Sequence, residues 1–296
     1  MKKATLLHNP KAGDKSYTKK ELMSLLESQG VKCMYSSIKI DGWDDIHPKT
    51  AFIIIAGGDG TVRKVAEKLW ENGQNAKYEI ALFPAGTANN IAKTLDIAGN
   101  DEEIIKSWEK KIVRKLDAGK ISNLGKSRFF LESFGLGIFP HLMKEMKQKD
   151  ENGKDSPEKK LEGALNLLNQ LMESYRPFYC EIEIDGKEYT GKYLMVEIMN
   201  TQSIGPNLIF SPNANTADGE FEVVLISEDQ KEKFRSYISE KLQGSENPAP
   251  FDTLRAKKIL IKCKNYLAHS DDELIEVKDI STVEIEVMKS FLKFLV

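Results

Sequence analysis

The segment that most constrains the fold of this chain is AFIIIAGGDGT, at residues 51–61. Its first six residues, Ala51 to Ala56, form the longest apolar run in the sequence, and three glycines follow within four positions. Continuous rather than alternating apolarity is typical of a strand that is buried on both faces of a parallel sheet. The run is much shorter than the ~20 apolar residues of a membrane-spanning helix. We therefore expect an inner strand of an α/β layer here, and no transmembrane helix in the chain.

Strand and helix patterns alternate around this segment. Strand-like runs occupy residues 4–8, 31–38 and 79–86, and amphipathic helix patterns occupy residues 18–29, 62–69 and 88–95. Such alternation indicates a parallel sheet that is flanked by helices. We therefore predict that residues 1–117 form one α/β domain.

After residue 117 the pattern changes to short strands that are separated by turn signals. They lie at residues 129–139, 178–200, 221–227, 256–263 and 282–287. One helical stretch, residues 158–175, carries an apolar stripe that we interpret as core or interface packing. The charged residues before it, 147–160, are expected to form a solvated loop. We predict a mainly antiparallel β-sandwich domain over residues 118–287, followed by a tail at residues 288–296.

Length and charge fit this division. The 296 residues are enough for two domains of about 150 residues each. The formal net charge is −2, which argues against nucleic acid as the main partner. Residues 1–117 carry 19 basic and 16 acidic side chains, whereas the remainder carries 24 and 29. If one half of the chain binds phosphate, we expect it to be the first.

The cysteines and histidines suggest neither a disulfide framework nor a metal centre. The three cysteines, Cys33, Cys180 and Cys263, are odd in number and far apart, which favours a reducing, cytoplasmic location. The four histidines are not clustered, so a histidine-ligated metal is not expected. We interpret His8 as a structural residue rather than a catalytic base.

Two glycine-containing loops follow predicted strands. In Gly57–Thr61, the glycines allow a ligand close to the main chain, and the helix start that follows favours an anion. Asp59 would repel a phosphate, so a divalent cation between them would resolve the conflict; the alternative is a tight turn in which Asp59 caps a helix. The second loop, Pro84–Asn90, has the same character, and its alternative is a helix start capped by Thr87. Because ligands bind at the carboxyl ends of parallel strands, the two loops could wall one crevice.

These motifs belong to an ordered set that runs over essentially the whole chain: NPKAG (9–13), GGDGT (57–61), PAGTANNIA (84–92), Asn200, SPNANTADGEF (211–221) and SDDE (270–273). The set resembles the diacylglycerol kinase catalytic family, which includes sphingosine kinases and bacterial lipid kinases. The resemblance implies a nucleotide-binding α/β domain, a β-sandwich domain and an active site in the cleft between them. It also implies ATP-dependent phosphorylation of a lipid hydroxyl with Mg²⁺, and a C-terminal tail that packs back on the first domain.

The resemblance assigns roles residue by residue. ATP would be held by Asn9, Pro10, Lys11, Ala12, Gly13, Gly57, Gly58, Asp59, Gly60, Thr61 and Thr87. A structural Mg²⁺ would be held by Asp218, with backbone carbonyls near Asn215 and Glu220. Catalysis would fall to Asp271, Glu273 and Asp59, which would position magnesium or accept the hydroxyl proton. Since Asp271 and Glu273 stand two apart, an extended backbone would put both side chains on one face; the alternative is an exposed acidic turn.

The sequence departs from the family pattern at four positions. Arg63 and Lys64 follow GGDGTV where the family has Asn-Glu, and they would either touch phosphates or, as we prefer, face solvent. Asn90 replaces an aspartate, and Asp272 replaces the glycine between the two acids. None of these changes removes a proposed acid.

The sequence therefore predicts a lipid kinase that visits the membrane surface peripherally to collect its substrate. Two alternative functions are also compatible with the sequence. One is a nicotinamide-dinucleotide kinase, whose family also uses a GGDGT loop, and the other is a non-catalytic nucleotide-binding regulator. The sequence fixes neither the lipid acceptor nor whether the chain forms a homo-oligomer.

Overall fold

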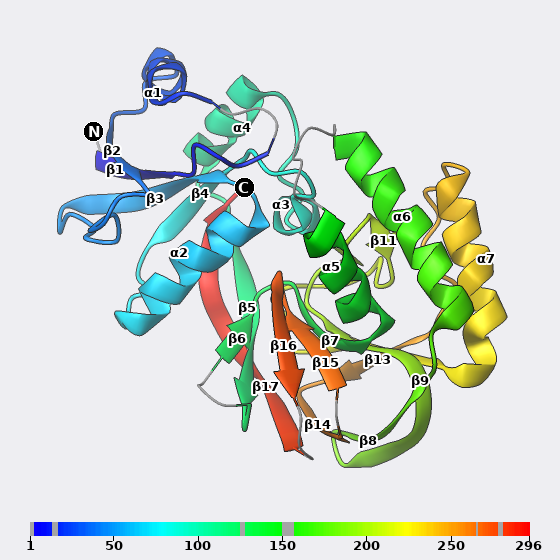
Figure 1. Cartoon of the computed structure of the whole chain (residues 1–296). Coiled ribbons are helices and arrows are strands. Elements are labelled where there is room, and N and C mark those ends of the chain that lie inside the picture. Colours follow the sequence, from blue (N-terminus) through cyan, green and yellow to red (C-terminus); the bar gives the residue numbers. More distant parts are fainter. Residues whose placement is uncertain (1–2, 14–16, 125–127, 150–156, 265, 278–280) are drawn as a thin grey trace. The chain divides into compact units, whose positions relative to one another are not determined.

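The computed structural model describes residues 3–13, 17–124, 128–149, 157–264, 266–277 and 281–296 (Figure 1). The chain divides into two compact units, unit 1 with Met1–Asp117 and Lys289–Val296, and unit 2 with Ala118–Met288. The expected charged loop over residues 147–160 is wrong at both ends, since residues 147–149 and 157–160 are helical, and its middle, residues 150–156, lies outside the described residues.

A parallel sheet forms the centre of unit 1. Its strands are β1 (Lys3–His8), β2 (Cys33–Ser37), β3 (Thr50–Gly57), β4 (Glu79–Pro84) and the end of β17 (Ser281–Leu295), in the order β2-β1-β3-β4-β17. Every neighbouring pair in this order is parallel. Residues 53–55, three consecutive isoleucines of β3, have no exposed surface. The continuous apolar run is therefore an inner strand, as predicted.

Helices α1 (Lys19–Ser28), α2 (Asp59–Glu71), α3 (Asn90–Thr94) and α4 (Asp101–Ser107) also belong to unit 1, and a short 3-10 helix (Trp108–Lys110) follows α4. Helix α1 begins at a capping box in which the Thr18 hydroxyl accepts a hydrogen bond from the Glu21 N–H and the Glu21 carboxylate accepts one from the Thr18 N–H. Helix α2 buries the predicted face, Val62, Val65, Ala66 and Leu69. Helix α4 was not predicted, although Asn100 and Glu103 form a second capping box at its start.

Antiparallel strands dominate unit 2. They are β5 (Val113–Ser122), which begins in unit 1, β6 (Arg128–Phe130), β7 (Ser133–Gly137), β8 (Phe178–Ile184), β9 (Lys187–Met199), β12 (Phe221–Ser227), β13 (Thr253–Ala256), β14 (Lys258–Cys263), β15 (Tyr266–Ser270) and β16 (Glu273–Val277). The order is β16-β15-β7-β9-β8-β14-β17, and β12 pairs with both β9 and β13. Short strands β10 (Ser203–Ile204) and β11 (Leu208–Ile209) form a separate ribbon.

The prediction of a single helix in this region is wrong. Helices α5 (Ile138–Lys149), α6 (Pro157–Ser174) and α7 (Lys231–Leu242) all belong to the described part of unit 2. The stripe of α6 is buried, as expected, in an apolar cluster that α5, α7, β9 and β12 share. Helix α7 was not predicted because half of its residues are charged and it buries few residues, among them Phe234, Tyr237 and Ile238. A second apolar cluster lies among the strands.

The expectation that no disulfide forms is also wrong. Cys180 on β8 and Cys263 on β14 are joined by a disulfide with a Cα–Cα distance of 5.0 Å. The antiparallel pairing of β8 with β14 brings together two residues that are 83 positions apart, which their spacing alone could not reveal. The cysteine count therefore no longer supports a reducing compartment. Cys33 is outside the disulfide, and burial raises the pKa of its thiol to about 11.

Among the described helices, none combines the length and the apolar character that crossing a bilayer requires.

Candidate functional site

The loops that follow β1, β3 and β4 meet at the carboxyl ends of these strands in unit 1. A Cβ atom on Gly58 would lie 2.7 Å from the Cα atom of Gly86, so a side chain at this position would force the two loops apart. Gly13 has φ +62°, and a Cβ there would overlap the carbonyl oxygen of Ala85. The glycines are therefore needed for close backbone approach, as well as for the turns themselves.

Hydrogen bonds join the same loops. The Asn9 side-chain amide donates to the Thr61 hydroxyl at 3.0 Å. The backbone N–H of Asn9 donates to Ala56 O, and that of Ala85 donates to Gly57 O, each at 3.0 Å. The NPKAG, GGDGT and PAGTANN motifs thus form one cluster, which we call the glycine-loop cluster (residues 9–13, 57–61 and 84–90).

Asp59 fixes the start of the helix that follows the last of these loops. Its carboxylate accepts hydrogen bonds from the backbone N–H groups of Asn90 at 2.9 Å and Ile91 at 3.0 Å, which open α3. The alternative that Thr87 caps this helix is wrong, because Thr87 is exposed and the residue at the cap position is Asn89. Burial raises the pKa of Asp59, against the lowering effect of the two N–H groups.

The cluster has the features of an anion site. Helix α2 begins at Asp59, and the N–H groups of a helix start attract anions by hydrogen bonding and by the helix dipole. Exposed Gly60, Lys11 and Thr87 lie in the three loops. Of the two unusual cations, Lys64 does not simply face solvent, as the sequence suggested. Its ammonium donates a hydrogen bond to Ile38 O at 2.9 Å, outside this cluster.

His8 precedes the first loop but is not placed for proton transfer. It is 2% exposed, and its Nδ1 lies 3.0 Å from the Tyr35 hydroxyl. Burial lowers the pKa of its imidazole, which favours the neutral form. The structural interpretation of His8 agrees with these contacts.

In unit 2, the predicted acids Asp271 and Glu273 lie at the turn between β15 and β16. Asp271 has φ +52° and is only 8% exposed. Its carboxylate accepts hydrogen bonds from the backbone N–H groups of Leu131 at 3.0 and 3.1 Å, Glu132 at 2.8 Å and Ser133 at 3.2 Å. The Asp271 carboxylate therefore holds the backbone between β6 and β7 in place.

Glu273 has a different environment. It is the first residue of β16, is half-buried, and forms an ion pair with Arg128 of β6. The expectation that both acids share one face of an extended segment is wrong, because the turn at Asp271 breaks the extended backbone. The alternative of an exposed acidic turn is also incorrect for Asp271, which is buried.

A buried ion pair that the sequence did not predict lies next to this turn. His269 Nε2 is 2.9 Å from a Glu197 carboxylate oxygen, and His269 Nδ1 is 2.9 Å from Asp271 O. Glu197 on β9 and His269 on β15 flank Gly135 of β7, where a Cβ would lie 2.8 Å from His269 Nε2 and overlap the Glu197 carboxylate. The glycine thus leaves the space in which the two side chains meet.

Both groups that His269 contacts are hydrogen-bond acceptors, which favours the doubly protonated imidazolium. Burial opposes that charge, but the Glu197 carboxylate and the Asp271 carbonyl together raise the pKa of His269 above its ordinary value. The partners are 72 residues apart in the sequence, so only the pairing of β7 with both β9 and β15 could have revealed them.

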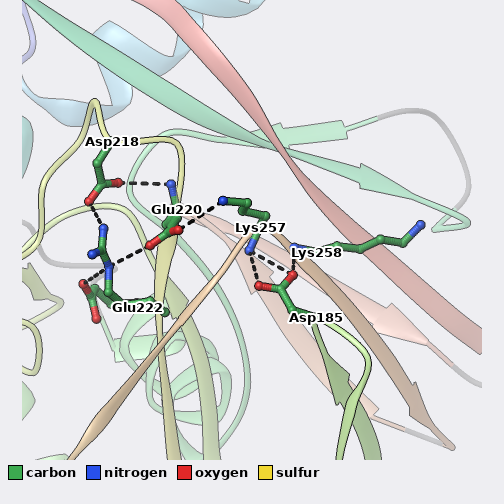
Figure 2. A network of polar contacts seen from close by, with 7 residues as sticks. Asp185, Asp218, Glu220, Glu222, Lys257 and Lys258 are labelled. Atoms are coloured by element: carbon green, nitrogen blue, oxygen red, sulfur yellow. Dashed lines mark hydrogen bonds and ion pairs between the residues drawn. The ribbon is translucent and has the colours of Figure 1, made fainter.

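The predicted magnesium ligands lie before β12, and Figure 2 shows two of them, Asp218 and Glu220. One Asp218 oxygen accepts a hydrogen bond from the Glu220 N–H at 3.0 Å, and the other pairs with the Arg255 guanidinium. The Asn215 side-chain oxygen accepts a hydrogen bond from the Ala217 N–H at 3.1 Å. Mg²⁺ binds through carboxylates, and it would have to displace the Arg255 guanidinium from Asp218, its one predicted carboxylate ligand, so the arrangement does not fit the ion. Across the described ranges, no group of three or more His, Cys, Asp or Glu side chains is placed to hold a metal.

Two family models cover most of the chain. The model described as "Diacylglycerol kinase catalytic domain" matches residues 3–121, and the model described as "YegS C-terminal NAD kinase beta sandwich-like domain" matches residues 147–294. Residues 3–121 therefore belong to the diacylglycerol kinase catalytic-domain family, and residues 147–294, half of the chain, to the second family. This confirms the resemblance inferred from the sequence and the predicted enzyme class, a lipid kinase.

Individual proteins agree with this assignment. The chain is 25% identical over 255 residues to a diacylglycerol kinase of Bacillus subtilis (strain 168), covering 82% of this chain and 80% of that protein. It is 28% identical over 179 residues to a proposed lipid kinase of Staphylococcus aureus (strain MSSA476), covering 60% of this chain and about half, 54%, of that protein.

A solved structure supports the fold. The crystal structure of a proposed diacylglycerol kinase from Bacillus anthracis (strain Sterne) matches with a TM-score of 0.70 at 21% identity. The match covers 99% of this chain and 97% of that chain. The predicted combination of an α/β domain and a β-sandwich domain is thereby confirmed.

Proposed function

We propose that this protein transfers the γ-phosphoryl group of ATP to the hydroxyl group of a lipid alcohol. The observation that carries the proposal is the glycine-loop cluster, in which three loops touch at the carboxyl ends of parallel strands in a member of a kinase family. A cluster of this kind suits the phosphates of a nucleotide because backbone N–H groups can approach them closely. ATP is proposed to arrive as its Mg²⁺ complex, which neutralises part of the phosphate charge.

Asp59 has a positioning role in this proposal. Its carboxylate already accepts two backbone N–H groups of α3, so it holds the second glycine loop against the first. Phosphoryl transfer depends mainly on positioning and charge neutralisation, and a shift of either loop would move the phosphates. Asn9 and Thr61 hold the remaining loop in the same way.

For the acceptor, we assign the base role to Glu273 and a supporting role to Asp271. Asp271 is committed to the backbone N–H groups of residues 131–133, whereas Glu273 is more exposed. In the proposed step the lipid hydroxyl gives its proton to the Glu273 carboxylate, its oxygen bonds to the γ-phosphorus, and ADP leaves. That the reaction occurs between the two domains, and that the protein meets its substrate at a membrane surface, stay predictions.

One observation favours a second candidate. The C-terminal family model is described as NAD kinase beta sandwich-like, so a nicotinamide dinucleotide is the alternative acceptor. Both acceptors present a hydroxyl group, and the same loops would serve either reaction.

One experiment separates these functions. The purified protein is incubated with γ-labelled ATP and Mg²⁺, and with either a total lipid extract in vesicles or NAD. We expect labelled lipid and no labelled dinucleotide. Gly58→Ala, which would separate the two loops, should abolish labelling, whereas the matched variant Gly163→Ala on the exposed face of α6 should not. Label on NAD alone would select the alternative, and ATP binding without label on either acceptor would indicate the non-catalytic regulator.

A further inference from the structure

The Asp218 turn leads into a strand whose acids face a strand with basic residues. Asp218 and Glu220 lie just before β12 and Glu222 is its second residue, whereas Arg255 lies on β13 and Lys257 just after it. Strands β12 and β13 are antiparallel, with Glu222 directly opposite Arg255. Ion pairs between these residues show that the three acids and two bases gather at one place.

Arg255 contacts all three carboxylates, and Figure 2 labels the three acids. Its guanidinium pairs with Asp218, its Nε lies 2.9 Å from a Glu220 oxygen, and the same Nε lies 3.9 Å from Glu222. Lys257 adds a second cation, with its ammonium 3.4 Å from the other Glu220 oxygen. Asp218 and Glu220 are 23% and 25% exposed at their side chains, so water screens them only in part.

A cation is needed at this place. Three carboxylates on one face repel one another, and partial burial strengthens that repulsion. The planar guanidinium has several N–H donors in a fixed arrangement, so one arginine can bridge neighbouring carboxylates. Mg²⁺ would have to displace the guanidinium from Asp218 and find an octahedral set of oxygens at about 2.0–2.1 Å.

We propose that Arg255 is the cation of the Asp218 turn and takes the place of the Mg²⁺ that the sequence predicts there. The conformation of this turn then depends on a side chain of the protein and not on the concentration of a divalent metal. The inference does not rest on the proposed kinase activity, because it concerns the folding of unit 2. It also leaves untouched any Mg²⁺ that arrives with the nucleotide.

The test measures thermal stability of the whole protein without nucleotide, so its outcome is separate from any activity. Melting temperatures are recorded in EDTA and in MgCl₂ at constant ionic strength, because salt alone screens ion pairs. The proteins are the wild type, Asp218→Asn, Arg255→Met and the double variant. Arg235→Met is the matched control, since the ion pairs of Arg235 on α7 with exposed glutamates are long, at 3.7 and 4.0 Å.

We expect MgCl₂ to shift the wild type and Asp218→Asn equally. Arg255→Met should lower the melting temperature by about 2–5 °C, and Arg235→Met by less. The effects of Asp218→Asn and Arg255→Met should not add, because the two residues act on one another. If Arg255→Met proves too unstable to purify, Arg255→Lys replaces it, because lysine keeps the charge but loses the planar contact. Its melting temperature should lie below that of Arg235→Met and above that of Arg255→Met.

Two results would overturn the proposal. One is a rise in the wild-type melting temperature with MgCl₂ that disappears in Asp218→Asn, which would place a metal at this turn. The other is additivity of the two single substitutions, which would show that Arg255 and Asp218 do not stabilise one another.

Discussion

The glycine-loop cluster of unit 1 and the β15–β16 turn of unit 2 both use an aspartate to hold backbone N–H groups. Asp59 holds the start of α3, and Asp271 holds the segment between β6 and β7. The clusters differ in what lies beside the aspartate. Asp59 belongs to a group of loops whose glycines approach one another closely, whereas the backbone carbonyl of Asp271 contacts the buried His269, which pairs with Glu197.

The difference shows that an aspartate that binds backbone N–H groups can have two different roles. A carboxylate among glycine loops leaves exposed backbone beside it for a ligand. A carboxylate among buried side chains mainly stabilises the fold, and the neighbouring Glu273 keeps the more accessible position. The comparison predicts that Asp271 variants lose stability first and that Asp59 variants lose activity first.

The largest effect is expected from Asp271→Ala. It leaves the N–H groups of residues 131–133 without their acceptor, so the free energy of unfolding should fall by about 3 kcal/mol or more. Urea denaturation of the whole protein measures this. Asp272→Ala, at the exposed neighbour in the same turn, should cost less than about 1 kcal/mol. Equal losses for both variants would contradict the anchoring role.

Asp59→Ala should show the opposite balance. We expect kinase turnover to fall by about 100-fold or more, as for loss of a group that organises charge and position, which corresponds to ~2.7 kcal/mol. The free energy of unfolding should fall by only about 1–2 kcal/mol, the usual cost of a lost helix cap. Steady-state kinetics and urea denaturation on one preparation give both values. A variant that unfolds but keeps its turnover per folded molecule would break the comparison.

Gly135→Ala tests the space between Glu197 and His269. The new methyl group would overlap the Glu197 carboxylate, so we expect the free energy of unfolding to fall by about 1–3 kcal/mol. Gly163→Ala is the matched control, because nothing lies within 4 Å of a Cβ there and alanine favours the helix. That control should be neutral or slightly stabilising.

The smallest expected effect is a pH dependence of the folding stability, which has opposite sign for His269 in unit 2 and His8 in unit 1. The pKa of His269 is raised in the folded state, so its contribution to stability is complete below pH ~6.5 and is lost as pH rises through the folded pKa. The pKa of His8 is lowered, so its contribution is complete above pH ~6.5 and is lost as pH falls through the folded pKa.

Melting curves of the wild type and His269→Gln between about pH 6 and pH 9 check the first sign. The difference in melting temperature should shrink as pH rises. A difference that grows with pH would show that His269 is neutral when folded.

Much of the fold could be predicted from the sequence because its signals are local. The buried apolar strand before Gly57 and the helical spacing of the apolar residues of α2 depend only on nearby residues. Both elements lie where they were predicted. Helix α7 was missed because burial of its few apolar residues depends on α6 and β12, which the local pattern does not contain. The Cys180–Cys263 disulfide was missed for the same reason.

The candidate site was predictable in its glycine loops, where the residue type itself carries the signal. The partners of the acids were not predictable. Arg128, Glu197 and Arg255 each reach a partner that is at least 37 positions away in the sequence. Unlike a glycine between two strands, an arginine or glutamate in a strand has no distinctive local pattern. The roles assigned to Asp59, Asp271 and Glu273 stay predictions until the variants are measured.

The last strand of unit 1 carries a consequence for biosynthesis. Residues Lys293–Leu295 of β17 pair with Glu79–Ala81 of β4, so the parallel sheet gains its final strand from the far end of the chain. At a translation rate of about 5–20 residues per second, residue 295 follows residue 117 by roughly 10–35 s. During that interval the ribosome-bound chain displays one uncovered edge of β4, and chaperones that recognise such edges have their opportunity before the sheet is closed.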